Sequence, residues 1–313
     1  MNAAMLFNDI SVFIMKPILA LISALFFTTI AFSQANISDA NYRVFDSNGE
    51  PSSLEKIIEA AGQVDVVFLG EQHDDAVGHF LENEIFRKTF ERYGKERKVT
   101  LSLEMFERDE QIVVNEYLQG LITEKKFLDD SRPWGNYKTD YRPLVEFAKA
   151  NKLDVIAANA PRRYVNMVSR NGRSSVDQLS KDAKAWLAPL PYSQASEAYT
   201  KKFKALMGGS GEAAMGIDNI LASQSLWDAT MADSMAKYLK RNKNALIVQL
   251  NGAFHSENRL GTVEHLLRYR PKAKVIVVTM RYEDDFQHFD KIKYEKTGDF
   301  VILTDAKIPR SKR

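Results

Sequence analysis

The sequence contains no cysteine among its 313 residues. This absence excludes disulfide bonds, zinc–thiolate sites, iron–sulfur clusters and a cysteine nucleophile. It also excludes the lipidated cysteine of a lipoprotein, so we expect no lipid anchor. A large charge of one sign is missing as well, because 43 basic and 41 acidic residues leave a net charge of +2. With no basic stripe interleaved with aromatic residues, the composition argues against nucleic acid as a partner.

The residues that are present are typical of a folded protein with a large core. Apolar residues make up 45% of the chain and charged residues 27%, and there are 18 Phe and 12 Tyr. A disordered chain would be poorer in aromatic residues.

The N-terminus carries an apolar run over residues 17–32, preceded by Lys16, and Ala31 and Ser33 are small residues two positions apart. A positive charge, an apolar stretch and a small-residue cleavage site are typical of an export signal. We therefore expect residues 1–33 to be a signal peptide, and residues 34–313 to be exported through the inner membrane to the periplasm or the exterior. Met15 directly precedes Lys16 and is the alternative start. A membrane anchor competes with this interpretation, but the run is short for a span of about 20 residues.

Six short apolar runs, rich in β-branched residues, predict the strands of a sheet. They are Val64–Gly70, Lys98–Phe106, Lys152–Ala160, Asn244–His255, Lys272–Met280 and Asp299–Ala306. Nearly continuous apolar runs of this length are typical of strands buried on both faces, as in a parallel sheet. Helical patterns lie between them, including one after the first strand that Asp74 and Asp75 are suited to cap. The pattern predicts an α/β fold, a parallel β-sheet flanked by helices.

The segment of about residues 162–242 contains no strand-like run and predicts a smaller all-α insertion. Three helices are expected there, over Asp177–Leu187, Ser196–Met207 and Ile217–Lys240. Their Met and aromatic residues are interpreted mainly as packing, with a wall facing a ligand as the alternative.

Polar residues gather at the predicted strand ends, where parallel sheets bind ligands. They are Glu71, His73, Glu104, Asn159, Arg162 and His255. Two Gly-x-x-His motifs are among them, Gly70 to His73 and Gly252 to His255. Buried carboxylates and imidazoles are costly unless they are paired, so this group is a candidate site. The other histidines, His79, His265 and His288, fall on expected helix surfaces or loops and receive no role.

Five segments together resemble the ChaN family of haem-binding uptake proteins: GEQHDDAVGHFLE, LEMFERDEQ, YRPLVEFAKANKLDVIAANAPRRYV, SLWDATMA and NGAFHSENRLGTVEHL. The family shares a superfamily with Tiki-type metalloproteases, TraB and pheromone-shutdown proteins, and erythromycin esterases. The resemblance covers about residues 64–280.

The resemblance implies haem bound beside the helical insertion between two protomers, with a tyrosinate ligating the iron. Tyr164 is the expected ligand, with Tyr141 and Tyr137 as alternatives, and Arg162 and Arg163 would meet the propionates. A haem-linked homodimer and an outer-membrane haem receptor are the implied partners.

Three functions follow in order of preference. The first is an exported, non-enzymatic haem or iron-chelate carrier. The second is a metal-dependent hydrolase or peptidase in which His73, Glu104 and His255, with Glu71, hold a divalent ion that activates water. The third is a metal-free esterase-type hydrolase with a histidine as general base, oriented by a glutamate.

Overall fold

The computed structural model describes residues 37–207 and 216–311, so the predicted signal peptide over residues 1–33 lies outside the described residues. The described residues form one seven-stranded sheet in the order β1-β7-β6-β2-β5-β3-β4. Its strands are β1 (Tyr42–Asp46), β2 (Val66–Glu71), β3 (Lys98–Glu107), β4 (Val155–Asn159), β5 (Ala245–Gly252), β6 (Val275–Glu283) and β7 (Phe300–Asp305). Every neighbouring pair is parallel except β1 with β7. The predicted α/β class with a mainly parallel sheet is confirmed.

The edge strand β1 is a structural element that the sequence patterns missed. It has five residues, YRVFD, of which only Val44 and Phe45 are buried. A short strand with charged residues at an exposed edge lacks the continuous apolar run that marks the other six strands. It pairs antiparallel with β7, where its register is Tyr42 opposite Thr304.

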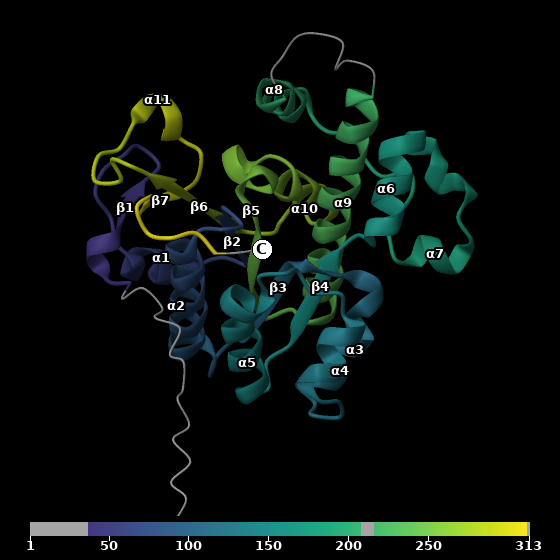
Figure 1. Ribbon diagram of the computed structural model, residues 1–313, viewed down its shortest axis with the longest axis horizontal. Coiled ribbons are helices and arrows are strands. Elements are labelled where there is room, and N and C mark those ends of the chain that lie inside the picture. Colours follow the sequence, from purple (N-terminus) through teal and green to yellow (C-terminus); the bar gives the residue numbers. More distant parts are fainter. Residues whose placement is uncertain (1–36, 208–215, 312–313) are drawn as a thin grey trace, which may run out of the picture. The chain divides into compact units, whose positions relative to one another are not determined.

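Both faces of the sheet are covered by helices, which explains the apolar runs. On β2, Val67 and Leu69 belong to one core, with residues of α1 (Leu54–Ala61), α2 (Ala76–Tyr93) and α5 (Arg142–Ala150). Val66 and Phe68 point the other way, into a core with α9 (Ile217–Arg241) and α10 (Thr262–Tyr269). Helices lie against the sheet on both sides (Figure 1). Alternate residues thus meet opposite layers of helices, as the period of two along a strand requires.

The remaining helices are α3 (Gln111–Leu118), α4 (Glu124–Asp130), α6 (Arg162–Asn171), α7 (Lys181–Ala185), α8 (Glu197–Leu206) and α11 (Lys291–Tyr294). As expected, Asp75 caps α2, since its carboxylate accepts a hydrogen bond from the Val77 N–H at 3.1 Å. The single helix predicted over Asp177–Leu187 is wrong. A 3₁₀ segment ends at Gln178, and Ser180 then caps the short helix α7 by accepting from the Ala183 N–H.

Within the part of the chain that the structure describes, no helix has the length and apolar character needed to cross a membrane.

Candidate functional site

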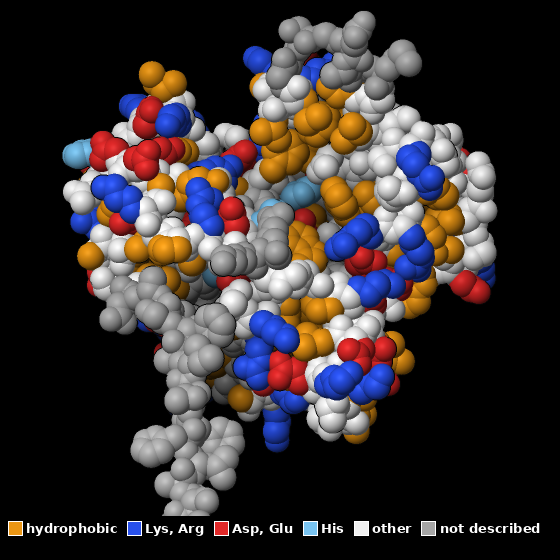
Figure 2. All heavy atoms as spheres, in the orientation of Figure 1, with side chains coloured by type: hydrophobic (Ala, Val, Ile, Leu, Met, Phe, Trp, Pro, Cys, Tyr) orange, Lys and Arg blue, Asp and Glu red, His pale blue; other side chains and the backbone are white. Residues whose placement is uncertain are grey.

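A cleft of about 1070 Å³ opens at the carboxyl ends of the central strands. The chain leaves β2 through α2 toward β3 and leaves β5 through α10 toward β6, which lies on the other side of β2. Adjacent strands whose connections run in opposite directions leave a crevice at their carboxyl ends. Figure 2 shows histidine side chains inside this hollow, with apolar side chains gathered around it.

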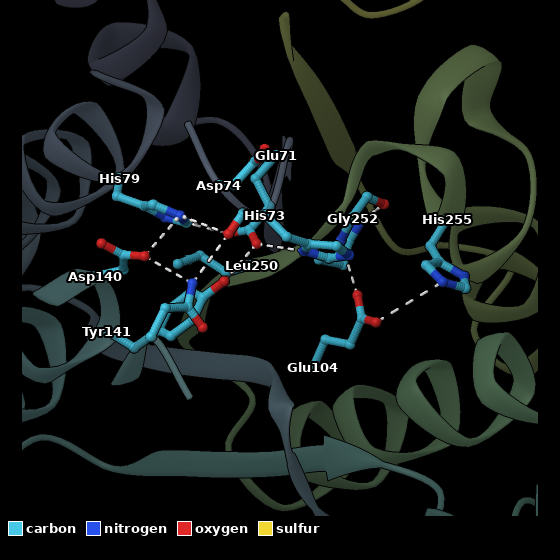
Figure 3. Close-up of polar contacts among 12 residues, drawn as sticks. Glu71, His73, Asp74, His79, Glu104, Asp140, Tyr141, Leu250, Gly252 and His255 are labelled. Atoms are coloured by element: carbon cyan, nitrogen blue, oxygen red, sulfur yellow. Dashed lines mark hydrogen bonds and ion pairs between the residues drawn. The ribbon is translucent and has the colours of Figure 1, made fainter. Parts of the chain in front are cut away.

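The first dyad of the site is Glu71 with His73, at the end of β2. Nδ1 of His73 lies 2.6 Å from Oε1 of Glu71, which also accepts a hydrogen bond from the Tyr141 hydroxyl at 2.7 Å (Figure 3). Burial alone would raise the pKa of Glu71, but His79 and then His73 outweigh it and lower that pKa to about 2. Glu71 is therefore a carboxylate that fixes the ring of His73, whose side chain is 26% exposed to the cleft.

Two glycines allow this arrangement by their lack of a side chain. A Cβ on Gly252 would lie 2.8 Å from both Nε2 and Cε1 of His73, so the β5 backbone approaches that ring directly. A Cβ on Gly70 would lie 3.0 Å from the Cα of Ala253. The glycines of the two Gly-x-x-His motifs thus permit the strand ends to pack against each other.

The second dyad is His255 with Asp228, a residue of α9. Nδ1 of His255 lies 2.8 Å from Oδ1 of Asp228, which also accepts from the Thr262 hydroxyl at 2.7 Å. On its other side, Nε2 of His255 lies 3.8 Å from Oε1 of Glu104, and Oε2 of Glu104 accepts from the Gly252 N–H at 2.8 Å (Figure 3). Burial alone would lower the pKa of His255, but Asp228 and then Glu104 raise it to about 9. His255 is therefore a cation at neutral pH.

A third group lies buried behind His73 and includes His79, which the sequence interpretation assigned to a helix surface. That prediction is wrong, because His79 is only 4% exposed. Its Nδ1 lies 2.9 Å from Oε2 of Glu82 and 3.7 Å from Oε2 of Glu71. Burial alone would lower the pKa of His79, but the charges of Glu71 and Glu82 raise it to about 10. The pKa of Glu82 is raised as well, by burial and by the charge of Glu71. His265 is buried as well, whereas His288 is exposed.

The four predicted metal ligands do not form one cluster. Among the described residues, the carboxylates and imidazoles whose ligand atoms all lie within 4.8 Å of one another are Glu71, His79 and Glu82. His73 and His255 are each engaged by a different carboxylate, and Glu104 is held by the Gly252 N–H. The set Glu71, His73, Glu104 and His255 lines one cleft but does not converge on one point.

The three predicted haem-ligand tyrosines do not line the cleft. On α6 the cleft-lining residues are Arg162, Val165, Asn166 and Ser169, a spacing of three and four that marks one helix face. Tyr164 falls off that face and packs against the core of the helical segment, with the Arg163 guanidinium 4.4 Å from its ring. Tyr141 and Tyr137 are fully buried, and burial raises the pKa of both hydroxyls.

Two arginines line the cleft. Arg162 has an exposed side chain 3.6 Å from Glu107, and Arg281 of β6 pairs with Glu257. Arg163, predicted to accompany Arg162, instead pairs with Asp109 away from the cleft lining. The apolar part of the lining consists of Trp134, Ala160, Val165, Leu206, Ile220, Trp227, Ala253 and Phe254.

Sequence reasoning missed three residues of the site: Asp228, Arg281 and Trp134. Asp228 is an acid within the otherwise apolar and small segment SLWDATMA, and an acid on the buried face of a helix is a signal that could have found it. Arg281 follows the apolar run of β6 directly and so stands at a strand end. Trp134 lies in a loop, with its ring 4.8 Å from the ring of His73, and no sequence pattern indicates that contact.

Comparisons with known proteins identify a family and similar folds. The family described as haem-binding uptake, Tiki superfamily, ChaN matches residues 57–266. A solved structure described as cofacial haem binding to ChaN of Campylobacter jejuni is similar, with a TM-score of 0.64 and 17% identity over 86% of this chain and 98% of that one. A mutant of the erythromycin esterase EreC in its open conformation has a TM-score of 0.44 and 10% identity, over 77% of each chain. Comparison with curated proteins gave no match. At these identities the structural likeness to ChaN establishes the fold.

Proposed function

The chain belongs to the ChaN family of haem-binding uptake proteins in the Tiki superfamily, and from this membership and the cleft we propose that it is an exported haem-binding protein acting in iron uptake. The membership confirms the resemblance carried by the sequence motifs. The observation that carries the proposal is a large cleft whose apolar walls surround a histidine with a free ring nitrogen.

The cleft suits a flat apolar ligand with charged edges. Its volume of about 1070 Å³ is slightly above the roughly 300–1,000 Å³ of small-molecule sites. Trp134, Trp227 and Phe254 supply aromatic surface for a porphyrin. Arg162 and Arg281 are the cations that would meet propionate carboxylates. The charged residues of the lining and its apolar residues thus match the two parts of a haem molecule.

The iron ligand in this proposal is His73. Because Nδ1 of His73 donates to Glu71, the lone pair of Nε2 is left for iron. A carboxylate behind a ligating imidazole also strengthens its basicity. Tyr164, the ligand that the family resemblance implied, packs against the helical core instead, so it ranks second.

Export and assembly are further parts of the proposal. The apolar segment before residue 34 supports export. The cofacial binding stated for the Campylobacter jejuni protein supports a haem-linked homodimer of this chain. In this proposal, an outer-membrane haem receptor delivers haem to this chain or accepts haem from it. Sedimentation of the protein with and without haemin would test the dimer, and a sedimentation coefficient unchanged by haemin would reject it.

The test of haem binding is a haemin titration followed by absorption spectroscopy, with His73→Ala and Tyr164→Phe as the two informative variants. We expect saturable binding with an imidazole-ligated spectrum that His73→Ala loses and Tyr164→Phe keeps. If only Tyr164→Phe loses the spectrum, Tyr164 is the iron ligand. Absence of saturable binding in the wild type would reject the carrier function itself.

A second candidate function is metal-free hydrolysis, which the two carboxylate–imidazole dyads favour. His73, oriented by Glu71, would take a proton from water, and cationic His255 would stabilise a developing oxyanion. A panel of ester substrates tests this candidate, with His288→Ala as the matched control on an exposed histidine. Activity that survives both His73→Ala and His255→Ala would reject it.

A further inference from the structure

Three buried side chains behind the cleft share one centre, and we name them the buried triad: Glu71 at the end of β2, and His79 and Glu82 one turn apart on α2. All three are at most 4% exposed. They are outside the lining of the cleft apart from Glu71, and haem binding makes no use of His79 or Glu82.

The orientation of His79 is fixed by what Nε2 contacts. Nε2 lies 3.2 Å from the carbonyl oxygen of His73 and 3.4 Å from Oδ2 of Asp140 (Figure 3). Both contacts are acceptors, so Nε2 carries the hydrogen. Asp140 is itself held in place, because Asn136 donates to one of its oxygens and Ser311 to the other. A ligating histidine with a carboxylate and a carbonyl behind its other nitrogen is the usual outer support of a metal site.

Nδ1 of His79 therefore faces the two carboxylates, and on losing its proton it would offer its lone pair to a metal ion. It lies 2.9 Å from Oε2 of Glu82 and 3.7 Å from Oε2 of Glu71. Ligand atoms bound to one tetrahedral zinc ion at its usual bond lengths stand roughly 3.3 Å apart. The distance from Nδ1 to Glu82 is shorter than that spacing, and the distance from Nδ1 to Glu71 is longer.

Two carboxylate oxygens of the buried triad have no hydrogen-bond partner, Oε2 of Glu71 and Oε1 of Glu82. The other oxygen of Glu71 accepts from Tyr141 and contacts His73, so only Oε2 is directed at the triad. Buried polar atoms without a partner are rare and costly in folded proteins. Without an ion, the proton on Nδ1 of His79 lies between these groups, as its raised pKa indicates. A divalent ion that displaces this proton would be held by both carboxylates and the imidazole.

We propose that the buried triad is a structural binding site for a divalent first-row metal ion, zinc or manganese, held by Glu71, His79 and Glu82. One imidazole and carboxylate oxygens are a donor set that both ions accept. The two negative charges of the glutamates balance the ion. Because all three side chains are buried, the ion would be shut off from a substrate in the cleft and would serve structure. The ion ties α2 to the end of β2, directly behind the residue that faces the cleft.

This site differs from the metal set expected from the sequence, which shares only Glu71 with it. It is also independent of haem, so its test contains no haem. The full-length chain, without a histidine tag, is refolded from denaturant with zinc or manganese, because a buried site is loaded best during folding. Excess metal is removed by gel filtration, and bound metal is measured by elemental analysis.

The informative variant is Glu82→Gln, which keeps the shape of the side chain, removes its charge and replaces one ligand oxygen by an N–H donor. The matched control is Glu104→Gln, another buried glutamate near a histidine. We expect one ion per chain in the wild type and in Glu104→Gln, and loss of that ion in Glu82→Gln. Metal that disappears in Glu104→Gln but stays in Glu82→Gln would locate it in the cleft and overturn the proposal, as would a wild type without stoichiometric metal.

A second measurement needs no variant and so does not depend on folding of Glu82→Gln. X-ray absorption of the zinc-loaded wild type counts the imidazoles around the ion. One imidazole with oxygen ligands is the expected result. Two imidazoles would assign the ion to His73 and His255 and overturn the buried triad as its site.

Discussion

The ion pair between Asp228 and His255 should make the stability of the protein depend on pH in the alkaline range. Both side chains are buried, with Nδ1 and Oδ1 2.8 Å apart. The pKa of His255 is raised from its ordinary 6.5 to about 9, against the effect of burial, by Asp228 and Glu104. At about 1.4 kcal/mol per pH unit, this corresponds to roughly 3 kcal/mol.

The sign follows from the direction of the change in pKa. A histidine whose pKa is higher in the folded state contributes its full stability below the unfolded value of 6.5. That contribution is lost as the pH rises through the folded pKa of about 9. Asp228→Asn keeps the shape of the side chain and removes its charge. We therefore expect a loss of about 3 kcal/mol in the free energy of unfolding near about pH 6, and a much smaller loss near about pH 10.

The assay is urea unfolding of the wild type and Asp228→Asn at a series of pH values. Other buried groups such as His79 titrate too, so the difference between the two proteins is the quantity to follow. Asp285→Asn is the matched control, because Asp285 pairs with His288 at 2.7 Å on the surface, where both side chains are more than 70% exposed. Exposed pairs contribute little. A deficit of Asp228→Asn that is equal at both ends of the pH range would refute the reasoning.

Three further substitutions test the packing around the cleft. Gly252→Ala would place a Cβ 2.8 Å from the ring of His73, so we expect several-fold weaker haemin binding in titrations, and unchanged affinity would contradict His73 as the iron ligand. Arg108→Ala removes a buried guanidinium that binds Asp233 at 2.9 Å and two carbonyl groups. Urea unfolding should show that the free energy of unfolding falls by about 3–5 kcal/mol. A fall as small as that expected for a surface ion pair would mean that water replaces these contacts. Leu250→Ala opens a cavity in the fully buried centre of β5 and should cost about 2–5 kcal/mol by the same assay, while a negligible cost would contradict close packing between the sheet and its helices.

The helix α6 illustrates where sequence reasoning about the site fails. Tyr164 and Arg163 follow a strand end within three residues of Pro161, which is why they were expected at the ligand. In the structure the helix turns Arg162 and Val165 toward the cleft and carries Tyr164 to another side. Neighbours in sequence on a helix differ by about a quarter turn, so closeness along the chain does not decide which residue faces a ligand.

The burial of His79 on α2 is a second feature that sequence reasoning did not predict. His79 and Glu82 lie in a helix of modest apolar character, and polar residues of such a helix are expected at its surface. They are buried because the start of α2 packs against Glu71 and the short π-helical segment Tyr137–Tyr141. That contact joins segments about sixty residues apart and has no counterpart in the local pattern.

The sequence by itself determined the six strands β2 to β7, the polar residues at their carboxyl ends and the family. Short, nearly continuous apolar runs are typical of strands buried on both faces, and parallel strands bring their carboxyl ends to one edge wherever they stand in the chain. Only the tertiary structure decided which further helix residues reach that edge, from Asp228 on α9 to Asn166 on α6. The rotation of each helix about its axis is set by packing against the sheet, and side chains from distant segments settle that packing together.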